Sequence, residues 1–188
     1  PAPVGDAPDA GTGDGVCLTA SGTCTLRAAL GQATATSTAA PIAAPTYTIT
    51  FSVSGTITVG SVLDVAAAVT IDGSGQKVEV SGGDASQVFR FGDSRWPFTL
   101  RALTVRDGHL ADSFGGAGLY AATNGTVDAV TFASNVNATA YSPGLAGGGA
   151  ISVDSFRTVT IVNTTFDNNS VDANLGGADL FVRGSAIV

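Results

Sequence analysis

The sequence contains one histidine, His109, and it lies in the densest polar stretch of the chain, Arg106-Asp107-Gly108-His109-Leu110-Ala111-Asp112. A Ser-His-Asp arrangement would have to use this histidine, and so would a metal site built with Asp107 and Asp112. Spacing within one loop establishes neither kind of site. A solvated polar loop explains the same residues and is the favoured interpretation, so we assign no catalytic residue and no metal ligand here.

Aspartates offer a second route to chemistry, because glycoside hydrolases use paired carboxylates. Asp72, Asp93 and Asp107 would meet on one face if the chain stacked repeated units in register. Turn formation explains each of these aspartates equally well. The D-x-D-x-D spacing of calcium loops is absent. We therefore predict no cofactor, with Ca²⁺ only as a weak alternative, and the enzyme class stays uncertain and disfavoured.

Arginines and one tryptophan suggest a binding patch, because guanidinium groups and aromatic faces suit stacking on rings. The candidate polar or sugar-contact patch comprises Arg90, Arg95, Trp96, Arg101, Arg106, Asp107 and His109. The alternative is that the arginines pair with nearby aspartates on the surface. We favour this alternative for most of them.

The elements that would position these residues follow a repeat, seen most clearly in Ile161, Thr164, Phe166 and Asn169. Earlier segments fit the same template in the sets Val127, Val130, Phe132 and Asn135; Leu100, Leu103, Val105 and Gly108; Ala66, Val69, Ile71 and Ser74; and Thr46, Ile49, Phe51 and Ser54. Further strands are predicted at 88–91, 118–120, 150–153 and 179–182. This pattern predicts stacked rungs, each one circuit of the chain, as in an all-β right-handed parallel β-helix, a pectate-lyase-like solenoid.

Equivalent positions in stacked rungs lie one above the other at strand spacing. Asn135 and Asn169 hold the same template position, so a hydrogen-bonded asparagine ladder is expected there. Thr56-Ile-Thr58 and Thr158-Val-Thr160 suggest a threonine ladder of the kind that binds ice, although such a site needs many aligned rungs.

Composition limits the partners. The net charge is −7 and Lys77 is the only lysine, so no basic patch for nucleic acid is expected. The chain lacks an apolar run of roughly 18 residues, so no transmembrane segment is predicted. The length suits one domain.

The N-terminal region has its own organisation. Residues 1–16 are expected to form a flexible lead-in, and 17–188 a single β-helix domain with rungs over 46–188. Cys17 and Cys24 are more consistent with a disulfide loop than with a metal site, because no second pair completes a coordination shell. Helical spacing from Thr25 to Ala33 predicts a short helix within 17–36, capped by Thr23 or Thr25, that covers one end of the stack.

The segment GDGVCLTASGTCTLRAAL, residues 13–30, resembles the N-terminal motif of secreted proteins often called CSLREAI-domain proteins, in which a Cys pair precedes a Ser-Leu-Arg-Glu-Ala-Ile helix and a β-helix follows. Ala28 stands at the Glu position, so any capping or salt-bridge role of that Glu is absent. Thr48–Phe51 and Val69–Gly73 resemble the family's first two rungs.

The stretch Gly148-Gly149-Ala150-Ile151 and the Phe-x-x-Asn pairs at 132–135 and 166–169 are similar to repeats of the chlamydial polymorphic outer-membrane adhesins. These resemblances imply a secreted or cell-surface right-handed parallel β-helix, often a module of a larger adhesin-like protein. They define no reaction.

Residues 179–188, DLFVRGSAIV, carry apolar strand-like sequence with no polar cap, and Leu180, Val182, Ile187 and Val188 form a candidate assembly edge. Either the β-helix continues, or another chain docks there, or identical subunits stack head to tail. The function expected overall is non-enzymatic extracellular adhesion or structural assembly, with surface proteins, glycans or identical subunits as partners. The alternative is a carbohydrate-binding or carbohydrate-active protein.

Overall fold

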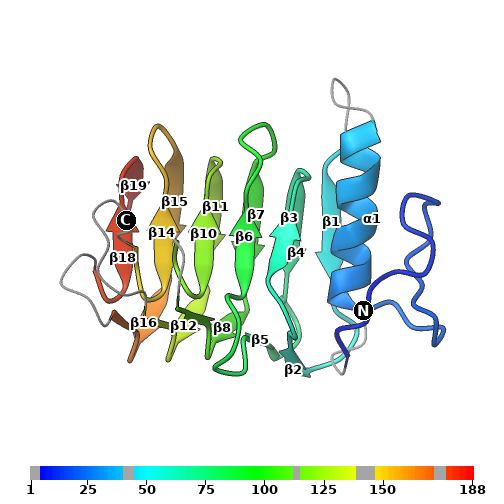
Figure 1. Cartoon of the computed structure of the whole chain (residues 1–188), viewed down its shortest axis with the longest axis horizontal. Coiled ribbons are helices and arrows are strands. Elements are labelled where there is room, and N and C mark those ends of the chain that lie inside the picture. Colours follow the sequence, from blue (N-terminus) through cyan, green and yellow to red (C-terminus); the bar gives the residue numbers. More distant parts are fainter. Residues whose placement is uncertain (1–4, 40–44, 112–114, 139–146, 172–176) are drawn as a thin grey trace.

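The chain is built mainly of parallel β-sheets with one α-helix at one end (Figure 1). The structure, a computed structural model, describes residues 5–39, 45–111, 115–138, 147–171 and 177–188. Within these residues every strand pair is parallel and in register. The prediction of a mostly β, parallel fold with a single short helix is confirmed.

Four sheets carry the strands. Sheet A has the order β1 (Tyr47–Thr50), β4 (Val69–Asp72), β7 (Phe98–Arg101), β11 (Gly125–Asp128), β15 (Thr158–Val162) and β19 (Ser185–Ile187). Sheet B has the order β2 (Gly55–Thr58), β5 (Val78–Ser81), β8 (Thr104–Arg106), β12 (Thr131–Ala133) and β16 (Thr165–Asp167). Sheet C has the order β3 (Leu63–Val65), β6 (Phe89–Phe91), β10 (Leu119–Ala121), β14 (Ile151–Val153) and β18 (Leu180–Val182). Sheet D has the order β9 (His109–Leu110), β13 (Val136–Asn137) and β17 (Ser170–Val171).

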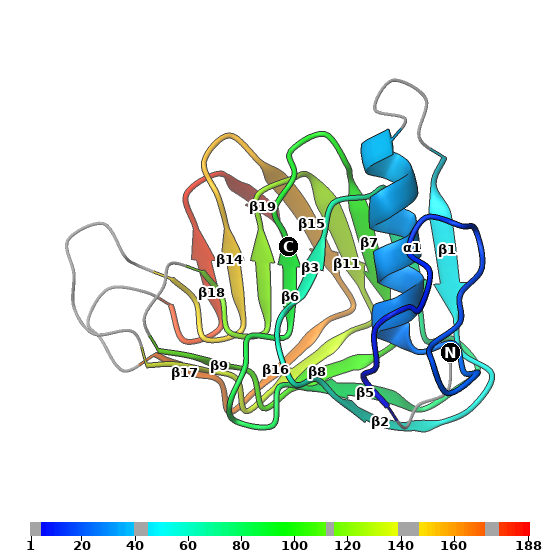
Figure 2. The same cartoon turned by 45° about the vertical axis from the view of Figure 1, so that its right-hand side comes forward.

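Each rung contributes one strand to each sheet in turn. The chain passes from sheet A to sheet B to sheet C and then returns to sheet A, and the later rungs add a short strand of sheet D between B and C. Each strand therefore pairs with the corresponding strands of the rungs before and after it, as the two views show (Figures 1 and 2).

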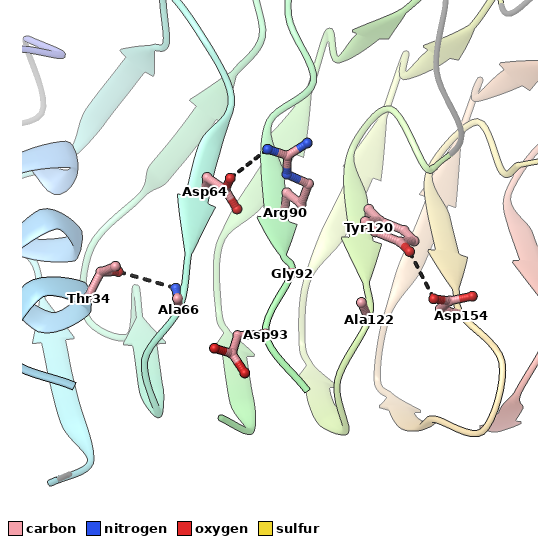
Figure 3. A pocket seen from close by; sticks show the side chains of 9 residues that line it. All are labelled: Thr34, Asp64, Ala66, Arg90, Gly92, Asp93, Tyr120, Ala122 and Asp154. Atoms are coloured by element: carbon pink, nitrogen blue, oxygen red, sulfur yellow. Dashed lines mark hydrogen bonds and ion pairs between the residues drawn. The ribbon is translucent and has the colours of Figure 1, made fainter. Parts of the chain in front are cut away.

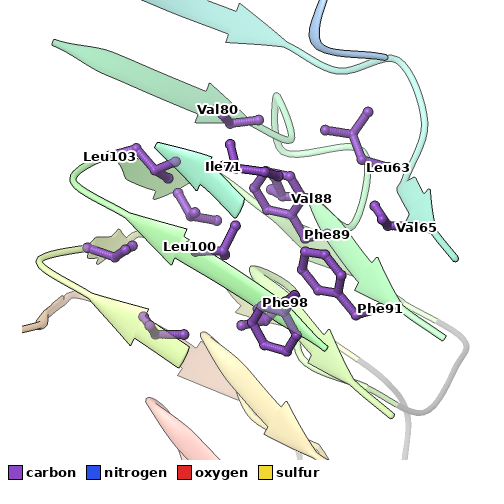
Figure 4. Packing of buried hydrophobic residues seen from close by; sticks show 14 of the residues in the cluster. Leu63, Val65, Ile71, Val80, Val88, Phe89, Phe91, Phe98, Leu100 and Leu103 are labelled. Carbon is purple, nitrogen blue, oxygen red and sulfur yellow. The ribbon is translucent and has the colours of Figure 1, made fainter. Parts of the chain in front are cut away.

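The core lies inside the circuit and is formed by inward-pointing apolar residues of sheets A, B and C together with residues of α1. In sheet A these residues make one buried column, Ile49, Ile71, Leu100, Val127 and Ile161. Aromatic side chains fill the space between sheets A and C (Figure 4). The rings of Phe91 and Phe98 stack with their centroids 4.1 Å apart. A shift of one residue along a strand would turn its apolar side chains outward and lose this burial, so the apolar alternation fixes the register.

The predicted template holds for the later rungs and is wrong for the first two. Val105, Phe132 and Phe166 are paired in sheet B, as expected. Ile71, however, pairs with Leu100 in sheet A rather than matching Val105. In the rung that precedes Val105, its sheet B partner is Val80.

A longer turn between sheets A and B in the early rungs explains this difference. Asp72 follows the inward residue of β4, and its Oδ1 accepts a hydrogen bond from the Ser74 backbone N–H at 2.8 Å. The Gln76 N–H then donates to the Gly73 carbonyl. These turn residues move the next inward position further along the chain than in the later rungs. The strands predicted at 88–91, 118–120, 150–153 and 179–182 do correspond to sheet C.

Helix α1 (Leu26–Ala39) packs against β1 and β3 of the first rung. Thr25 caps it, because its Oγ1 accepts a hydrogen bond from the Ala28 N–H at 3.1 Å. Leu26 and Leu30 are buried and join the core. The helix runs beyond the predicted Ala33, although threonines are poor helix formers. Their hydroxyls bond to carbonyls one turn back, as Thr36 does to the Gln32 carbonyl at 3.0 Å.

Residues 5–16 pack against the helix instead of forming the flexible lead-in that the composition predicts. Asp6 pairs with Arg27 through two hydrogen bonds of 2.9 and 2.8 Å. The same guanidinium donates to the carbonyls of Ser61 and Val62, which lead into β3. The side-chain amide of Gln32 holds the loop, accepting from the Gly13 N–H at 2.7 Å. Sequence pattern missed this because each contact joins residues distant in the chain.

Cys17 and Cys24 are joined by a disulfide, with their Cα atoms 5.1 Å apart. The bond closes a small loop immediately before the capping residue Thr25. It therefore anchors the chain at the start of the helix.

The end of the stack opposite α1 presents strands paired on one side only, among them β16, β18 and β19 within the described chain. Leu180 packs against the core, while Val182 and Val188 are exposed. Ile187 pairs with Thr160, whose side chain points outward on sheet A. Although β19 is the last strand of sheet A, the side chain of Ile187 therefore points to the outer face of the sheet rather than along the stack. Head-to-tail stacking would require α1 to leave the first rung.

Candidate functional site

The outer face of sheet C carries a groove with a volume of about 750 Å³ (Figure 3). Its lining residues are Thr34, Asp64, Ala66, Arg90, Gly92, Asp93, Tyr120, Ala122 and Asp154. They come from α1 and from the strands β3, β6, β10 and β14 or the residues just after them. The groove therefore runs across the strands, from rung to rung.

A short sequence pattern in the strands of sheet C creates a row of polar side chains along one side of the groove, which we call the polar row. In β3, β6 and β10 the strand is a triplet in which the first and third residues point into the core, and the middle residue points outward. The middle residues Asp64, Arg90 and Tyr120 are paired in register. They therefore stand side by side, one rung apart.

The residues that follow the triplets form the floor. Ala66, Gly92 and Ala122 come directly after the paired residues Val65, Phe91 and Ala121, and they carry little or no side chain. A Cβ atom added to Gly92 would lie 3.5 Å from Asp64 Oδ1 and 4.0 Å from Arg90 Cγ, both ordinary contacts. The backbone does not require glycine at this position, so the hollow is not a by-product of a tight turn.

Two polar pairs frame the floor. Arg90 donates to Asp64 Oδ2 at 2.5 Å, and this hydrogen bond raises the pKa of the guanidinium. The Tyr120 hydroxyl donates to Asp154 Oδ2 at 3.0 Å. Burial, followed by this hydrogen bond, raises the pKa of Tyr120 to about 12. The phenol therefore stays neutral and the ring is held in one orientation at ordinary pH.

Asp93 stands at the lower side of the groove, in the turn that leads to sheet A. Arg95 binds its carboxylate with contacts of 2.5 to 3.2 Å, and the side-chain hydrogen bond to Arg95 lowers the pKa of Asp93. The same guanidinium lies over the ring of Trp96, 5.4 Å from its centroid. Asp93 is therefore ionised and held in place.

The predicted polar patch is not one surface. Arg90 lies on sheet C, Arg95 and Trp96 in the turn after it, Arg101 on sheet A, Arg106 on sheet B and His109 on sheet D. Neighbours along the chain are carried to different sides of the stack as it turns. Of the seven residues, only Arg90 lines the groove.

The alternative interpretation of the arginines, pairing with acidic side chains, agrees with the structure. Arg106 bonds Glu79 at 2.8 Å and also contacts Asp107. Arg101 lies 3.9 Å from Asp128. These pairs are partly exposed, and the two charges within each pair neutralise one another.

The other candidate constellations do not assemble. Asp72 ends a strand of sheet A, Asp93 follows sheet C and Asp107 follows sheet B, so these carboxylates do not converge. His109 lines a separate hollow of about 400 Å³ at the edge of sheet D, which Arg90 also borders. Asp112 lies outside the described residues. In the described ranges, no three or more His, Cys, Asp or Glu side chains are grouped to hold a metal ion.

Asn135 and Asn169 lie one above the other at the corner between sheets B and D. Asn135 Nδ2 donates to Asn169 Oδ1 at 2.9 Å and to the Val105 carbonyl at 3.1 Å. Asn135 Oδ1 accepts the Gly108 N–H at 3.0 Å. The ladder therefore links three rungs through buried amides.

Threonines form a row on the outer face of sheet A. Thr48, Thr70, Thr99, Thr126 and Thr160 are paired in register from strand to strand. The next outward row on the same face contains Asp72, Arg101 and Asp128. Thr56 and Thr58 belong to sheet B instead, so the two Thr-x-Thr segments that suggested an ice-binding ladder lie on different faces.

Sequence reasoning missed most of the groove: Thr34, Asp64, Ala66, Gly92, Tyr120, Ala122 and Asp154. A usable signal exists in the repeated triplets Leu63-Asp-Val65, Phe89-Arg-Phe91 and Leu119-Tyr-Ala121, with a polar residue between two apolar ones. Aligning these triplets would have brought Asp64, Arg90 and Tyr120 together.

Comparison of the chain with protein-family models, with curated proteins and with solved structures finds no match. None of the helical segments in the described ranges has the length and apolar character to cross a membrane.

Proposed function

We propose that this protein is a non-enzymatic adhesive module, secreted or displayed at a cell surface, that binds its ligand in the groove on sheet C. The groove itself carries the proposal. It is open to solvent, crosses several rungs, and combines a nearly bare floor with polar side chains already held in fixed positions. Pre-positioned polar groups around a concave surface are typical of binding sites.

The proposal includes the architecture: a right-handed parallel β-helix closed at one end by α1. Support comes from the order in which strands enter the sheets and from the in-register parallel pairing of successive rungs. A right-handed connection between parallel strands is the strongly preferred one. The disulfide between Cys17 and Cys24 is consistent with an oxidising, extracellular setting.

Binding is favoured over catalysis by the state of the carboxylates. A glycosidase needs a carboxylic acid with a raised pKa beside a second carboxylate. In the groove Asp64 is ion-paired with Arg90, and Arg95 lowers the pKa of Asp93. Asp154 accepts hydrogen bonds from Tyr120 and from the Ser155 N–H. These partners suit fixed acceptors better than a proton donor.

The test compares two tryptophan variants from the same rung. Gly92→Trp fills the groove, whereas Thr70→Trp places the same bulk on the outer face of sheet A. Both proteins and the wild type are applied to an array of polysaccharides, extracellular proteins and mucins, and the supernatants are assayed for released fragments. Binding that Gly92→Trp abolishes and Thr70→Trp retains, without fragment release, supports the proposal. Binding that survives Gly92→Trp, absence of any binding, or turnover contradicts it.

Association of identical chains is a second candidate, favoured by the one-sided pairing of β16, β18 and β19. Because α1 covers the first rung, such association would join two open ends into a pair rather than build a filament. Solution mass across a dilution series tests it. A dimer that Val182→Asp converts to monomers supports the pair, and a monomer at every concentration rules it out.

A further inference from the structure

We infer that the ligand of the sheet C groove is a neutral, extended oligosaccharide that lies along the stack, perpendicular to the strands. This inference rests on the proposed binding function of the groove and names its ligand class. It follows from the balance of charges, the shape of the floor, the aromatic wall and the direction of the groove.

The charges around the groove favour an uncharged ligand. Every acidic side chain that lines the groove already has a partner: Asp64 has Arg90, Asp93 has Arg95, and Asp154 has Tyr120. A strongly charged ligand would have to displace one of these partners. A hydroxyl group would not, because a carboxylate oxygen has lone pairs left after one hydrogen bond. The fixed groups therefore suit hydroxyls, which both donate and accept.

The floor of the groove suits the apolar face of a sugar ring. Ala66, Gly92 and Ala122 form a shallow, nearly bare strip below the polar row (Figure 3). Side-chain bulk is missing at Gly92 although ordinary contacts would tolerate it. A strip of backbone and methyl groups accepts the apolar C–H face of a sugar ring, whose hydroxyls then point sideways to the polar row.

Tyr120 provides the aromatic wall of the groove. Its ring stands between Arg90 and Asp154 and is half-buried. The hydrogen bond from its hydroxyl to Asp154 fixes the ring, so stacking on it costs little side-chain entropy. A rigid aromatic wall beside hydrogen-bonding groups is the usual composition of a sugar subsite. Charged polymers such as nucleic acid need clustered cations instead, and here the arginine is already paired.

The direction and length of the groove suit an extended ligand. The lining spans β3, β6, β10 and β14, and neighbouring strands lie about 4.8 Å apart, so the groove is roughly 14 Å long. Thr34 of α1 lines one end, and its hydroxyl accepts the Ala66 N–H at 3.2 Å. A single sugar ring would leave most of this length empty. The geometry matches a chain of several rings.

The experiment uses the intact chain and soluble probes of matched length. Neutral probes are cello-, manno- and xylo-oligosaccharides, and charged probes are oligogalacturonides and chitosan oligomers, each from the dimer upward. Affinities are measured by calorimetry for the wild type, Gly92→Trp, Tyr120→Ala and the control Thr70→Trp. We expect one neutral series to bind, with affinity rising with length and levelling off once the groove is filled. Gly92→Trp and Tyr120→Ala should weaken it by about tenfold or more, while Thr70→Trp changes it less than twofold.

The outcomes separate the inference from the proposed function. If a charged series or a protein binds in a manner sensitive to Gly92→Trp, the groove is a binding site and the neutral-glycan assignment is overturned. If a monosaccharide binds as well as the longer chains, the extended orientation is wrong. If no probe and no array component is sensitive to Gly92→Trp, the binding function itself fails. Added salt provides a further check, because neutral binding should be nearly independent of it.

Discussion

The outer faces of sheets A and C are built by the same parallel register, yet one is uniform and the other is hollowed. On sheet A the register repeats one residue type, giving the row from Thr48 to Thr160. On sheet C the corresponding row changes from Asp64 to Arg90 to Tyr120, and the row below it shrinks to Ala66, Gly92 and Ala122. Repetition thus builds the scaffold, and departures from repetition build the groove.

Inward positions of the two sheets are alike in their surroundings, whereas outward positions are not. Inward residues of both sheets share one core, so the two faces should be equally costly to disturb from inside. Outward residues contact different partners on the two sheets, so substituting them should have different effects.

Removing a core side chain beneath either face should destabilise the protein by a similar amount. Leu119→Ala under sheet C and Leu100→Ala under sheet A each delete a fully buried side chain. Each should cost about 3 kcal/mol of unfolding free energy, within the usual range for buried leucines. Urea denaturation followed by circular dichroism measures both. A cost for one variant below about 1 kcal/mol would show that the two sheets do not share one core.

Breaking the asparagine ladder should disturb both faces at once, because it ties rungs together at a corner. Asn135→Ala removes the side-chain partner of the Gly108 N–H and of the Val105 carbonyl, and it leaves Asn169 Oδ1 with only the hydrogen bond from the backbone N–H of residue 135. We expect a loss of about 2–3 kcal/mol. The control Thr126→Ala, on the face of sheet A, should stay within about 0.5 kcal/mol. Equal effects of the two substitutions would show that the ladder is dispensable.

The hydrogen bond that holds the aromatic wall of the groove should make stability depend on pH in alkali. Folding raises the pKa of Tyr120 to about 12, above the ordinary value of 10.0. The folded state therefore keeps a proton that the unfolded state loses. The resulting stabilisation is complete below pH 10 and is lost as pH rises towards 12.

Denaturation of the wild type and of Tyr120→Phe across this pH window isolates the effect. The wild type should lose more stability between pH 10 and 12 than the phenylalanine variant, which has no phenol to ionise. Parallel curves for the two proteins would mean that Tyr120 is not held as described.

The smallest difference should come from the exposed ion pairs of the two faces. Asp64–Arg90 on sheet C has a contact of 2.5 Å, whereas Arg101 and Asp128 on sheet A are 3.9 Å apart. Double-mutant cycles to alanine should give a coupling of about 0.5 kcal/mol or less for the first pair and nearly zero for the second, because solvent screens both. A larger coupling on sheet A would reverse the distinction drawn between the faces.

The sequence predicts the scaffold better than the groove, for physical reasons. Buried columns such as Leu100, Val127 and Ile161 leave a periodic signal, because every rung must fill the same core. The sequence template did not fit the early rungs, because the turn after Asp72 adds residues and shifts the next buried position further along the chain. In the groove, only the polar row leaves a signal, in the aligned triplets around Asp64, Arg90 and Tyr120. The floor leaves almost none, because what matters at Gly92 is an absent side chain.

Contacts between distant parts of the chain were also beyond pattern reading. Arg27 is an ordinary helix residue in the sequence, yet it joins Asp6 to the carbonyls before β3. The patch proposed around Trp96 failed for the opposite reason. Its members are close in sequence, but the circuit of the rung distributes them over different sheets, although Arg90 and His109 border a common hollow.

Because each rung pairs only with its neighbours, the number of rungs can be changed without altering the pairing within the rest of the molecule. Excising residues 98–124, one full circuit from β7 to just before β11, would bring Gly125 against Val69 and leave both ends of the stack as they are. The shortened protein would keep its helix and disulfide but lose Tyr120, and with it the wall of the groove. Duplicating the same circuit would lengthen the groove instead. The number of rungs therefore sets the length of the ligand that the groove can hold.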